Sequence, residues 1–205
     1  MTPADPAAVV RADHADADVL SRLIAEAFCD LAPSQWLIAD PAARRRIFPG
    51  YFRIYVEHTL ASGFVHTTAD RAAVALWMPA GQDPPDGYDE RLAAATGHRA
   101  RRFLAFDAAL DHHHPADIPH QHLAILAVRP DRQGQGTGTA LLRARHTALD
   151  RAGTPAYLEA SSPRSRDLYL RHGYVTRPGA PFHLPDGGPP MWPMWREPRR
   201  NPEPP

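Results

Sequence analysis

A glycine-rich turn between an apolar segment and an amphipathic one is the feature that most constrains the fold of this chain. Residues 122–128 are apolar on both faces and predict a buried strand. Residues 140–152 place apolar side chains at helical spacing and end at Gly153, which predicts a helix with a glycine C-cap. Alternating glycines before a helix can turn several N–H groups toward one point, so the turn predicts a pyrophosphate cradle. The turn consists of Gln133, Gly134, Gln135, Gly136, Thr137, Gly138 and Thr139.

The residue types of the turn exclude two well-known phosphate-binding loops. A P-loop needs a lysine after its last glycine, and all 23 basic residues of this chain are arginines. A Rossmann fingerprint has the spacing G-x-G-x-x-G near the start of a βαβ unit, whereas here G-x-G-x-G stands late in the chain. Taken alone, the turn also fits a flexible connection between a strand and a helix.

Periodicity along the rest of the chain predicts a mixed α/β sheet with helices on both faces. We expect a single domain over residues 1–197 and a disordered tail over residues 198–205. Trp36 is expected in a loop, and Pro49 is expected to break the second long helix. The predicted helices are 14–28, with Asp13 as N-cap, 41–62, 91–110, 140–152 and 164–172. The predicted strands are 9–11, 64–67, 71–78, 122–128, 155–160, 174–176 and 190–196, the last at a sheet edge.

Composition narrows the classes of function. The 23 basic and 23 acidic residues balance, which disfavours a general nucleic-acid binder. The single cysteine, Cys29, excludes an intrachain disulfide and a cysteine-based zinc cage. The longest apolar run, residues 72–78, is too short to span a bilayer, and the N-terminal segment lacks the apolar core of a signal peptide. We therefore expect a soluble, cytoplasmic protein without a nucleic-acid or membrane partner.

Three motifs in the second half of the chain resemble one enzyme superfamily. Residues 128–138 resemble the acyl-CoA signature Q/R-x-x-G-x-G/A of the Gcn5-related N-acetyltransferase (GNAT) superfamily. Residues 157–160 are similar to the next strand of that superfamily, and residues 168–174 are similar to its LY-x-x-x-GF helix. The resemblance is strong over about residues 120–176. Within the superfamily, the chain is most similar to the puromycin N-acetyltransferase type of actinobacterial enzyme.

The resemblance implies a GNAT fold and acetyl-CoA as co-substrate. It implies that Leu126, Ala127 and Val128 pair with the pantetheine amides like an added strand. The N–H groups from Gln133 to Thr139 would hold the pyrophosphate. Ser165 stands where enzymes of this type often carry asparagine, and we expect it to contact CoA.

Three side chains are candidates for the proton transfers of amine acetylation. Tyr169 matches the helix tyrosine of the family and is expected to protonate the leaving thiolate. Glu159 is a carboxylate within an apolar strand and is expected to accept the ammonium proton, directly or through water. A salt bridge with a nearby arginine would equally explain a carboxylate at position 159. His122 on the preceding strand is a second candidate for the base.

The acceptor pocket matches the family only loosely. Trp36 and Trp77 are expected to contact the acceptor, with Phe28 and Tyr51 as further aromatic candidates. The histidines at 112–114, 120 and 122 show no regular ligand spacing, so no metal is expected.

The predicted function is acetyl transfer from acetyl-CoA to a primary amine of a small molecule, including an antibiotic, by a monomer or a homodimer. The alternatives are a peptide or protein N-terminal acetyltransferase and a non-catalytic acyl-CoA sensor. Acidic residues in the acceptor cleft would favour a cationic small molecule, whereas an open groove would favour a peptide.

Overall fold

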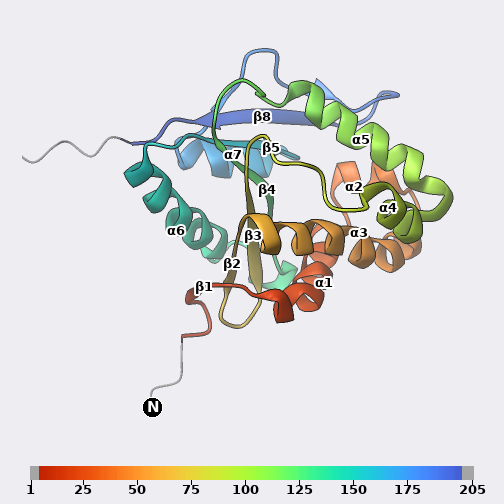
Figure 1. The fold of residues 1–205 in the computed structure, drawn as a ribbon, viewed down its shortest axis with the longest axis horizontal. Coiled ribbons are helices and arrows are strands. Elements are labelled where there is room, and N and C mark those ends of the chain that lie inside the picture. Colours follow the sequence, from red (N-terminus) through yellow and green to blue (C-terminus); the bar gives the residue numbers. More distant parts are fainter. Residues whose placement is uncertain (1–4, 200–205) are drawn as a thin grey trace, which may run out of the picture.

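A computed structural model describes residues 5–199, which build one mixed sheet with helices on both faces (Figure 1). The strands follow the spatial order β1-β2-β3-β4-β5-β8-β6, and β7 pairs with β8. All neighbouring strands are antiparallel except β4 and β5. The strands are β1 (Val9–Arg11), β2 (Phe64–Thr68), β3 (Ala73–Pro79), β4 (Gln121–Val128), β5 (Ala156–Ala160), β6 (Val175–Thr176), β7 (Phe182–His183) and β8 (Pro190–Arg196).

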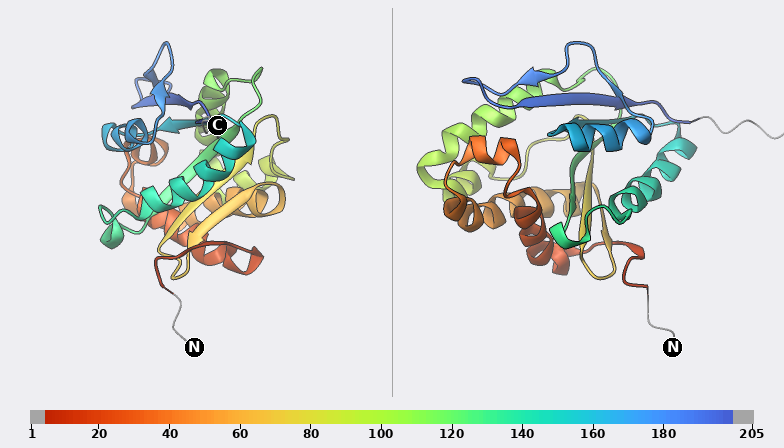
Figure 2. Two further views of the ribbon diagram at one scale, coloured as in Figure 1. Left: turned by 90° about the vertical axis from the view of Figure 1, so that its left-hand side faces the viewer. Right: turned by 180° about the vertical axis from the view of Figure 1, so that it is seen from behind.

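The helices divide between the two sides of strands β2–β4. Figure 1 shows α6 on one side of these strands and α1 and α3 on the other, and the view from behind in Figure 2 shows the same separation. The helices are α1 (Ala17–Phe28), α2 (Ala32–Leu37), α3 (Pro41–Ser62), α4 (Tyr88–Thr96), α5 (Ala100–His113), α6 (Thr137–Ala152) and α7 (Pro163–Arg171), with short 3-10 turns at His14–Asp16, Gly97–Arg99 and Pro130–Arg132.

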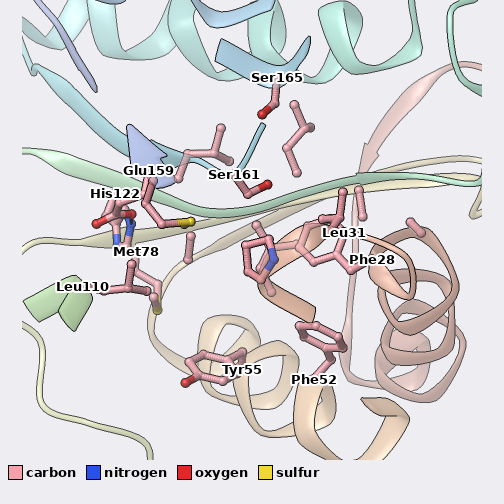
Figure 3. Close-up of a pocket in the computed structure, with 18 of the residues that line it drawn as sticks. Phe28, Leu31, Phe52, Tyr55, Met78, Leu110, His122, Glu159, Ser161 and Ser165 are labelled. Atoms are coloured by element: carbon pink, nitrogen blue, oxygen red, sulfur yellow. Dashed lines mark hydrogen bonds and ion pairs between the residues drawn. The ribbon is translucent and has the colours of Figure 1, made fainter. Parts of the chain in front are cut away.

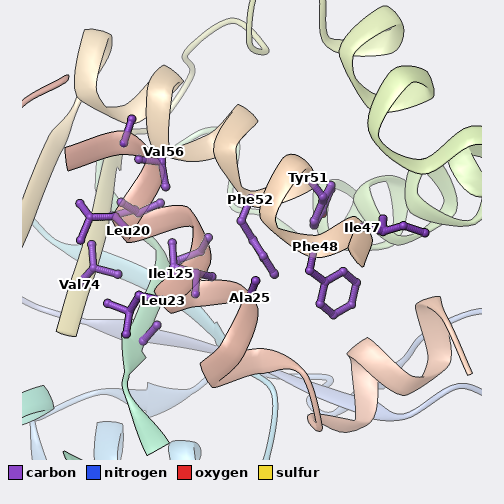
Figure 4. Close-up of a cluster of buried hydrophobic side chains, with 14 of the residues drawn as sticks. Leu20, Leu23, Ala25, Ile47, Phe48, Tyr51, Phe52, Val56, Val74 and Ile125 are labelled. Carbon is purple, nitrogen blue, oxygen red and sulfur yellow. The ribbon is translucent and has the colours of Figure 1, made fainter. Parts of the chain in front are cut away.

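Alternation along β3 contributes side chains to the two larger of the three hydrophobic clusters in the described residues. Val74 and Leu76 point toward α1 and α3, whereas Ala73, Ala75 and Trp77 point toward α6. All five side chains are fully buried, as expected of a central strand. Figure 4 shows the first cluster, in which side chains of α1 and α3 meet those of the sheet.

The sheet opens between its two parallel strands. Among the described residues, β4 and β5 pair only at Gln121 with Ala156 and at His122 with Tyr157. A register shift between Leu76 and Trp77 on β3 accompanies a bulge in β4 at Ala124. Beyond this point β4 stays paired with β3, and its other edge faces a cavity.

Two predictions about proline are wrong. Helix α3 runs through Pro49, because the buried Phe48 and Phe52 on either side of it pack into the first cluster. Such packing offsets the roughly 3 kcal/mol that an internal proline costs. Strand β8 lies inside the sheet, where Pro193 is tolerated because its neighbour β6 is only two residues long.

Most other elements agree with the sequence within two residues. Trp36 lies in the short helix α2, not in a loop, and α5 extends through His113 into the segment predicted as a loop. The predicted helix over 91–110 is two helices, α4 and α5. Of the predicted tail, residues 200–205 lie outside the described residues. No helix within residues 5–199 is long and apolar enough to cross a membrane.

Candidate active site

A cavity of about 850 Å³ lies where β4 and β5 separate. This volume is within the range of small-molecule sites. The wall includes residues of α1, α3 and α5, the loop before α4, the edge of β4, the glycine-rich turn and α7. Figure 3 shows His122 and Glu159 on one side of the cavity, Ser161 and Ser165 near α7, and Phe52 and Tyr55 below them.

The glycine-rich turn, residues 133–139, forms one end of the cavity and is called the cradle below. Gly134 and Gly136 adopt φ values of +79° and +86°, a region that favours glycine. Gly136 is the N-cap of α6, and no side chain caps the first N–H groups of this helix. Uncapped N–H groups and the helix dipole make this end of α6 suited to an anion.

Six of the seven predicted cradle residues line the cavity. These are Gln133, Gly134, Gly136, Thr137, Gly138 and Thr139. Gln135 does not belong to the cavity wall, and its side-chain amide donates instead to the carbonyl of Asp131 at 3.1 Å. The structure therefore gives no support to a ligand contact by the Gln135 side chain.

The edge of β4 next to the cradle is available to an added strand. Leu126, Ala127 and Val128 all line the cavity. The Arg129 N–H donates to the carbonyl of Ala72 on the β3 side, at 2.9 Å. Because backbone groups of successive residues face opposite edges, those of Leu126 and Val128 face the opening. The Val128 carbonyl already accepts a hydrogen bond there from the side-chain amide of Gln133, at 3.1 Å. Ala127 pairs with β3 and offers the opening no backbone group.

Helix α7 forms the other wall beside the cradle. Ser162 and Ser165 build a capping box at its start, and Ser165 lines the cavity. The Ser165 hydroxyl lies 2.9 Å from that of Ser162, so it is already engaged within the helix start. Arg164 donates to the side-chain oxygen of Gln133 at 3.4 Å and thereby connects α7 with the cradle.

Tyr169 lies on α7 with its ring in the second hydrophobic cluster and lines the cavity. Its side chain is buried, and burial raises the pKa of the phenol. Within residues 5–199 its hydroxyl makes no hydrogen bond. The phenol is thus protonated at neutral pH and available to a ligand in the cavity.

His122 and Glu159 meet at the point where β4 and β5 part. The Nε2 atom of His122 lies 2.9 Å from Oε2 of Glu159. The exposed fraction of the Glu159 side chain is 6%, and its Oε1 has no hydrogen-bond partner in the described part of the chain. Burial opposes ionisation of this carboxyl, but the charge and hydrogen bond of His122 outweigh burial and lower its pKa. Both predicted candidates for the base therefore form one pair, here called the dyad.

A second imidazole lies beside the dyad. One donor atom each of His114, His122 and Glu159 lie within 4.8 Å of one another. Burial and the charge of His122 lower the pKa of His114 to about 4, so this ring is neutral at physiological pH. Two imidazoles and a carboxylate are suitable ligands for Zn²⁺ and similar divalent ions. Spacing alone could not reveal this cluster, because Glu159 joins it from another strand.

Sequence reasoning missed an acidic wall beside the dyad. Asp107 and Asp111 of α5 line the cavity together with Tyr55 of α3 and Tyr88 of α4. The Asp107 carboxylate accepts hydrogen bonds from Tyr88 at 2.5 Å and from Tyr55 at 3.2 Å. Burial raises the pKa of Asp107 to about 6. Burial and the charge of Glu159 raise the pKa of Asp111. The i, i+4 spacing of the two aspartates was the only signal in the sequence.

Both predicted tryptophan contacts are wrong. Trp77 is fully buried in the second cluster on the α6 side of the sheet and does not line the cavity. Trp36 packs under the guanidinium of Arg102, 4.1 Å from the ring centroid, and donates its indole N–H to the carbonyl of Pro185. It lines a separate surface depression. Phe28 and Tyr51, the other two aromatic candidates, do line the cavity.

Residues 90–176 match the family model described as "acetyltransferase (GNAT) domain". This part of the chain is therefore similar to a GNAT acetyltransferase domain. The matched residues include the cradle, the dyad, Tyr169 and Ser165. They also include Asp107 and Asp111, whereas α1 and α3 lie outside the match.

Solved structures agree with the GNAT assignment. Histone acetyltransferase HPA2 and related acetyltransferase from Corynebacterium glutamicum is 28% identical, covers 94% of this chain and 97% of its own, and has a TM-score of 0.69. Arylalkylamine N-acetyltransferase 2 from Aedes aegypti is 16% identical with coverages of 94% and 99% and a TM-score of 0.60. The polyamine N-acetyltransferase from Drosophila melanogaster is 17% identical with coverages of 93% and 99% and the same TM-score. The last two identities show the fold alone.

The GNAT domain defines the class of reaction. Enzymes with this domain use acetyl-CoA as co-substrate, and the protein is accordingly an N-acetyltransferase of the acyltransferase class. The likeness to the puromycin N-acetyltransferase type remains a prediction.

Proposed function

We propose that the protein transfers the acetyl group of acetyl-CoA directly to a primary amine of a small cationic molecule. One observation carries this proposal: the cradle, Tyr169 and the dyad all line the same cavity. A cradle at a helix N-terminus suits the pyrophosphate of CoA, and the open edge of β4 suits its pantetheine arm. The thioester would then lie between an acid and a base.

The transfer needs two proton movements, and the cavity supplies a group for each. The amine nitrogen attacks the thioester carbonyl, the C–S bond breaks, and the thiolate takes the phenolic proton of Tyr169. The dyad accepts the proton that leaves the ammonium group, and either His122 or Glu159 takes it. The N–H group of Leu126 at the open edge of β4 is placed to polarise the carbonyl.

The charges of the cavity favour a cationic small molecule over a peptide. The cavity wall contains the carboxylates of Asp107, Asp111 and Glu159, and it also contains aromatic side chains. The arginines in the cavity wall, Arg132, Arg164 and Arg171, belong to the cradle side and to α7. Each end of the cavity therefore matches the charge of one substrate, the anionic CoA or the cationic amine.

Release of free thiol from acetyl-CoA, measured with a panel of amines, tests the proposal. The panel contains alkylamines, diamines, an aminonucleoside antibiotic and a peptide with a free N-terminus. We expect turnover with small amines and intersecting initial-velocity lines, because direct transfer requires a ternary complex. Parallel lines would indicate an acetyl-enzyme intermediate. Acetyl-CoA binding without turnover of any amine would favour the acyl-CoA sensor.

A further inference from the structure

The acidic wall contains more carboxylates than the transfer reaction needs. Proton acceptance from one amine requires one base, and the dyad with Glu159 fills that role. Asp107 and Asp111 have no task in the proton transfers. They lie one turn apart on α5, so they share one face of this helix, and both line the cavity.

Neither aspartate is neutralised by a basic side chain. Among the described residues, no arginine or histidine forms an ion pair with Asp107 or Asp111. Asp107 is partly buried and is held by the phenols of Tyr55 and Tyr88. A carboxylate has about four acceptor positions, so two phenols leave it able to bind another donor. Without a cation, its charge is costly at neutral pH.

A second observation points independently to a ligand at this end of the cavity. The Oε1 atom of Glu159 is buried without a hydrogen-bond partner in residues 5–199, although the side chain is 94% buried and lines the cavity. An acceptor in this state is rare unless a donor from outside the chain satisfies it. Asp111 lies close enough to Glu159 for their charges to interact. The three carboxylates thus form a row from the dyad to Asp107.

We propose that the Asp107 carboxylate, framed by Tyr55 and Tyr88, binds a second ammonium group of the acceptor, which makes the substrates diamines. This inference rests on the proposed function. One ammonium group lies at the dyad, where it is deprotonated and acetylated. The other lies at Asp107, with Asp111 between them. Met78 and Leu110 line the cavity beside the dyad and offer an apolar wall for the connecting methylene chain (Figure 3).

A diamine fits this wall better than a monoamine, because its two ammonium groups neutralise the carboxylates at both ends of the row, Glu159 and Asp107. A monoamine at the dyad would leave the Asp107 carboxylate buried without a counter-charge. Monoacetylation removes one positive charge from a diamine, so the product is held less tightly than the substrate.

The test compares a homologous series of α,ω-diamines with the n-alkyl monoamines of the same lengths. We expect kcat/KM of the wild-type enzyme to be roughly 10- to 100-fold higher for the best diamine than for its monoamine, the effect of one charged hydrogen bond. The Asp107→Asn variant should lose this preference through a higher KM for diamines, and its kcat/KM for monoamines should fall by a smaller factor. Asp89→Asn removes an exposed carboxylate on α4 outside the cavity and is the matched control.

Each outcome has a defined meaning. Equal kcat/KM for diamines and monoamines in the wild-type enzyme would overturn the inference, and this comparison needs no variant. An Asp107→Asn variant that keeps the preference would also overturn it. Absence of turnover with every amine would instead refute the proposed function. Calorimetric binding of diamines to the wild-type protein, compared with monoamines, then still decides whether Asp107 forms an ammonium site.

Discussion

The Nε2 atom of His122 lies 2.9 Å from Oε2 of Glu159, and the pair joins β4 to β5 next to the last position at which the two strands pair, His122 with Tyr157. The place where the sheet opens is therefore also the place where an imidazole and a buried carboxylate meet. Side chains on the two diverging strands are held by the paired segment behind them, whereas the cavity beyond them is free for both substrates.

Replacement of Glu159 by glutamine should lower kcat/KM by about 10²- to 10⁴-fold, the usual range for loss of a general base. Because free amine is scarce at low pH, the loss should be greatest there and should shrink as the substrate deprotonates itself. The measurement is the pH profile of kcat/KM for Glu159→Gln and for His122→Ala. Glu26→Gln, which changes an exposed residue of α1, is the control. A Glu159→Gln profile identical to that of the wild type would remove this residue from the mechanism.

Tyr169→Phe should lower kcat by about 10²- to 10⁴-fold and leave the Kd for acetyl-CoA nearly unchanged, because the phenol acts only in the transition state. Tyr174→Phe is the matched control. Tyr174 lies 5.7 Å from Tyr169 between ring centroids, but its hydroxyl is 3.0 Å from Nε2 of His146 and does not line the cavity. That variant should lose about 1 kcal/mol of stability and keep its turnover. Wild-type kcat in a folded Tyr169→Phe protein would assign Tyr169 a packing role.

Gly136→Val should weaken acetyl-CoA binding well beyond its effect on stability. A valine at φ +86° forces the N-cap of α6 to change conformation and displaces the N–H groups of the cradle. Gly153→Val imposes a similar strain at φ +62° at the opposite end of the same helix and is the control. Isothermal titration with acetyl-CoA measures both Kd values. If both variants bound acetyl-CoA equally well, the cradle would not hold the cofactor's phosphates.

Residues of the cradle and of the dyad were predictable as candidates, because their signals are local. The strand–glycine–helix pattern identifies residues 133–139, and a charged residue in an apolar strand identifies Glu159. The acidic wall was not predictable. Tyr55, Tyr88 and Asp107 lie on three different helices and meet only when α3, α4 and α5 pack together.

The error at Trp77 shows the limit of apolar periodicity in a central strand. Both faces of β3 are buried, so the sequence does not reveal which face meets the cavity. Trp77 points toward α6, whereas its neighbour Met78 lines the cavity. A difference of one residue along a strand thus separates a core side chain from a site residue.

Zinc should inhibit the enzyme by competing with the amine. His114, His122 and Glu159 can bind Zn²⁺ through the same atoms that serve the dyad. We expect inhibition that is relieved by a chelator and that is weaker in His114→Ala. His112→Ala, which changes an exposed histidine of the same helix end, is the control. Equal inhibition of the His114→Ala and wild-type enzymes would place the inhibitory metal elsewhere.

Asp107 should make the protein less stable as the pH rises. Its pKa is about 6 in the folded state against 3.8 as the ordinary value, so the folded protein binds this proton more tightly than the unfolded chain. The resulting stability is fully present below about pH 4 and is lost as the pH rises through about 6. The loss amounts to at most about 3 kcal/mol above that range. Asp107→Asn keeps an oxygen for the two phenols but does not ionise. Its free energy of unfolding relative to the wild type should therefore increase from about pH 4 to about pH 8, and chemical denaturation at several pH values measures this difference. A difference that does not vary with pH would show that Asp107 ionises equally easily in the folded and the unfolded protein. Burial would then not raise the pKa of Asp107.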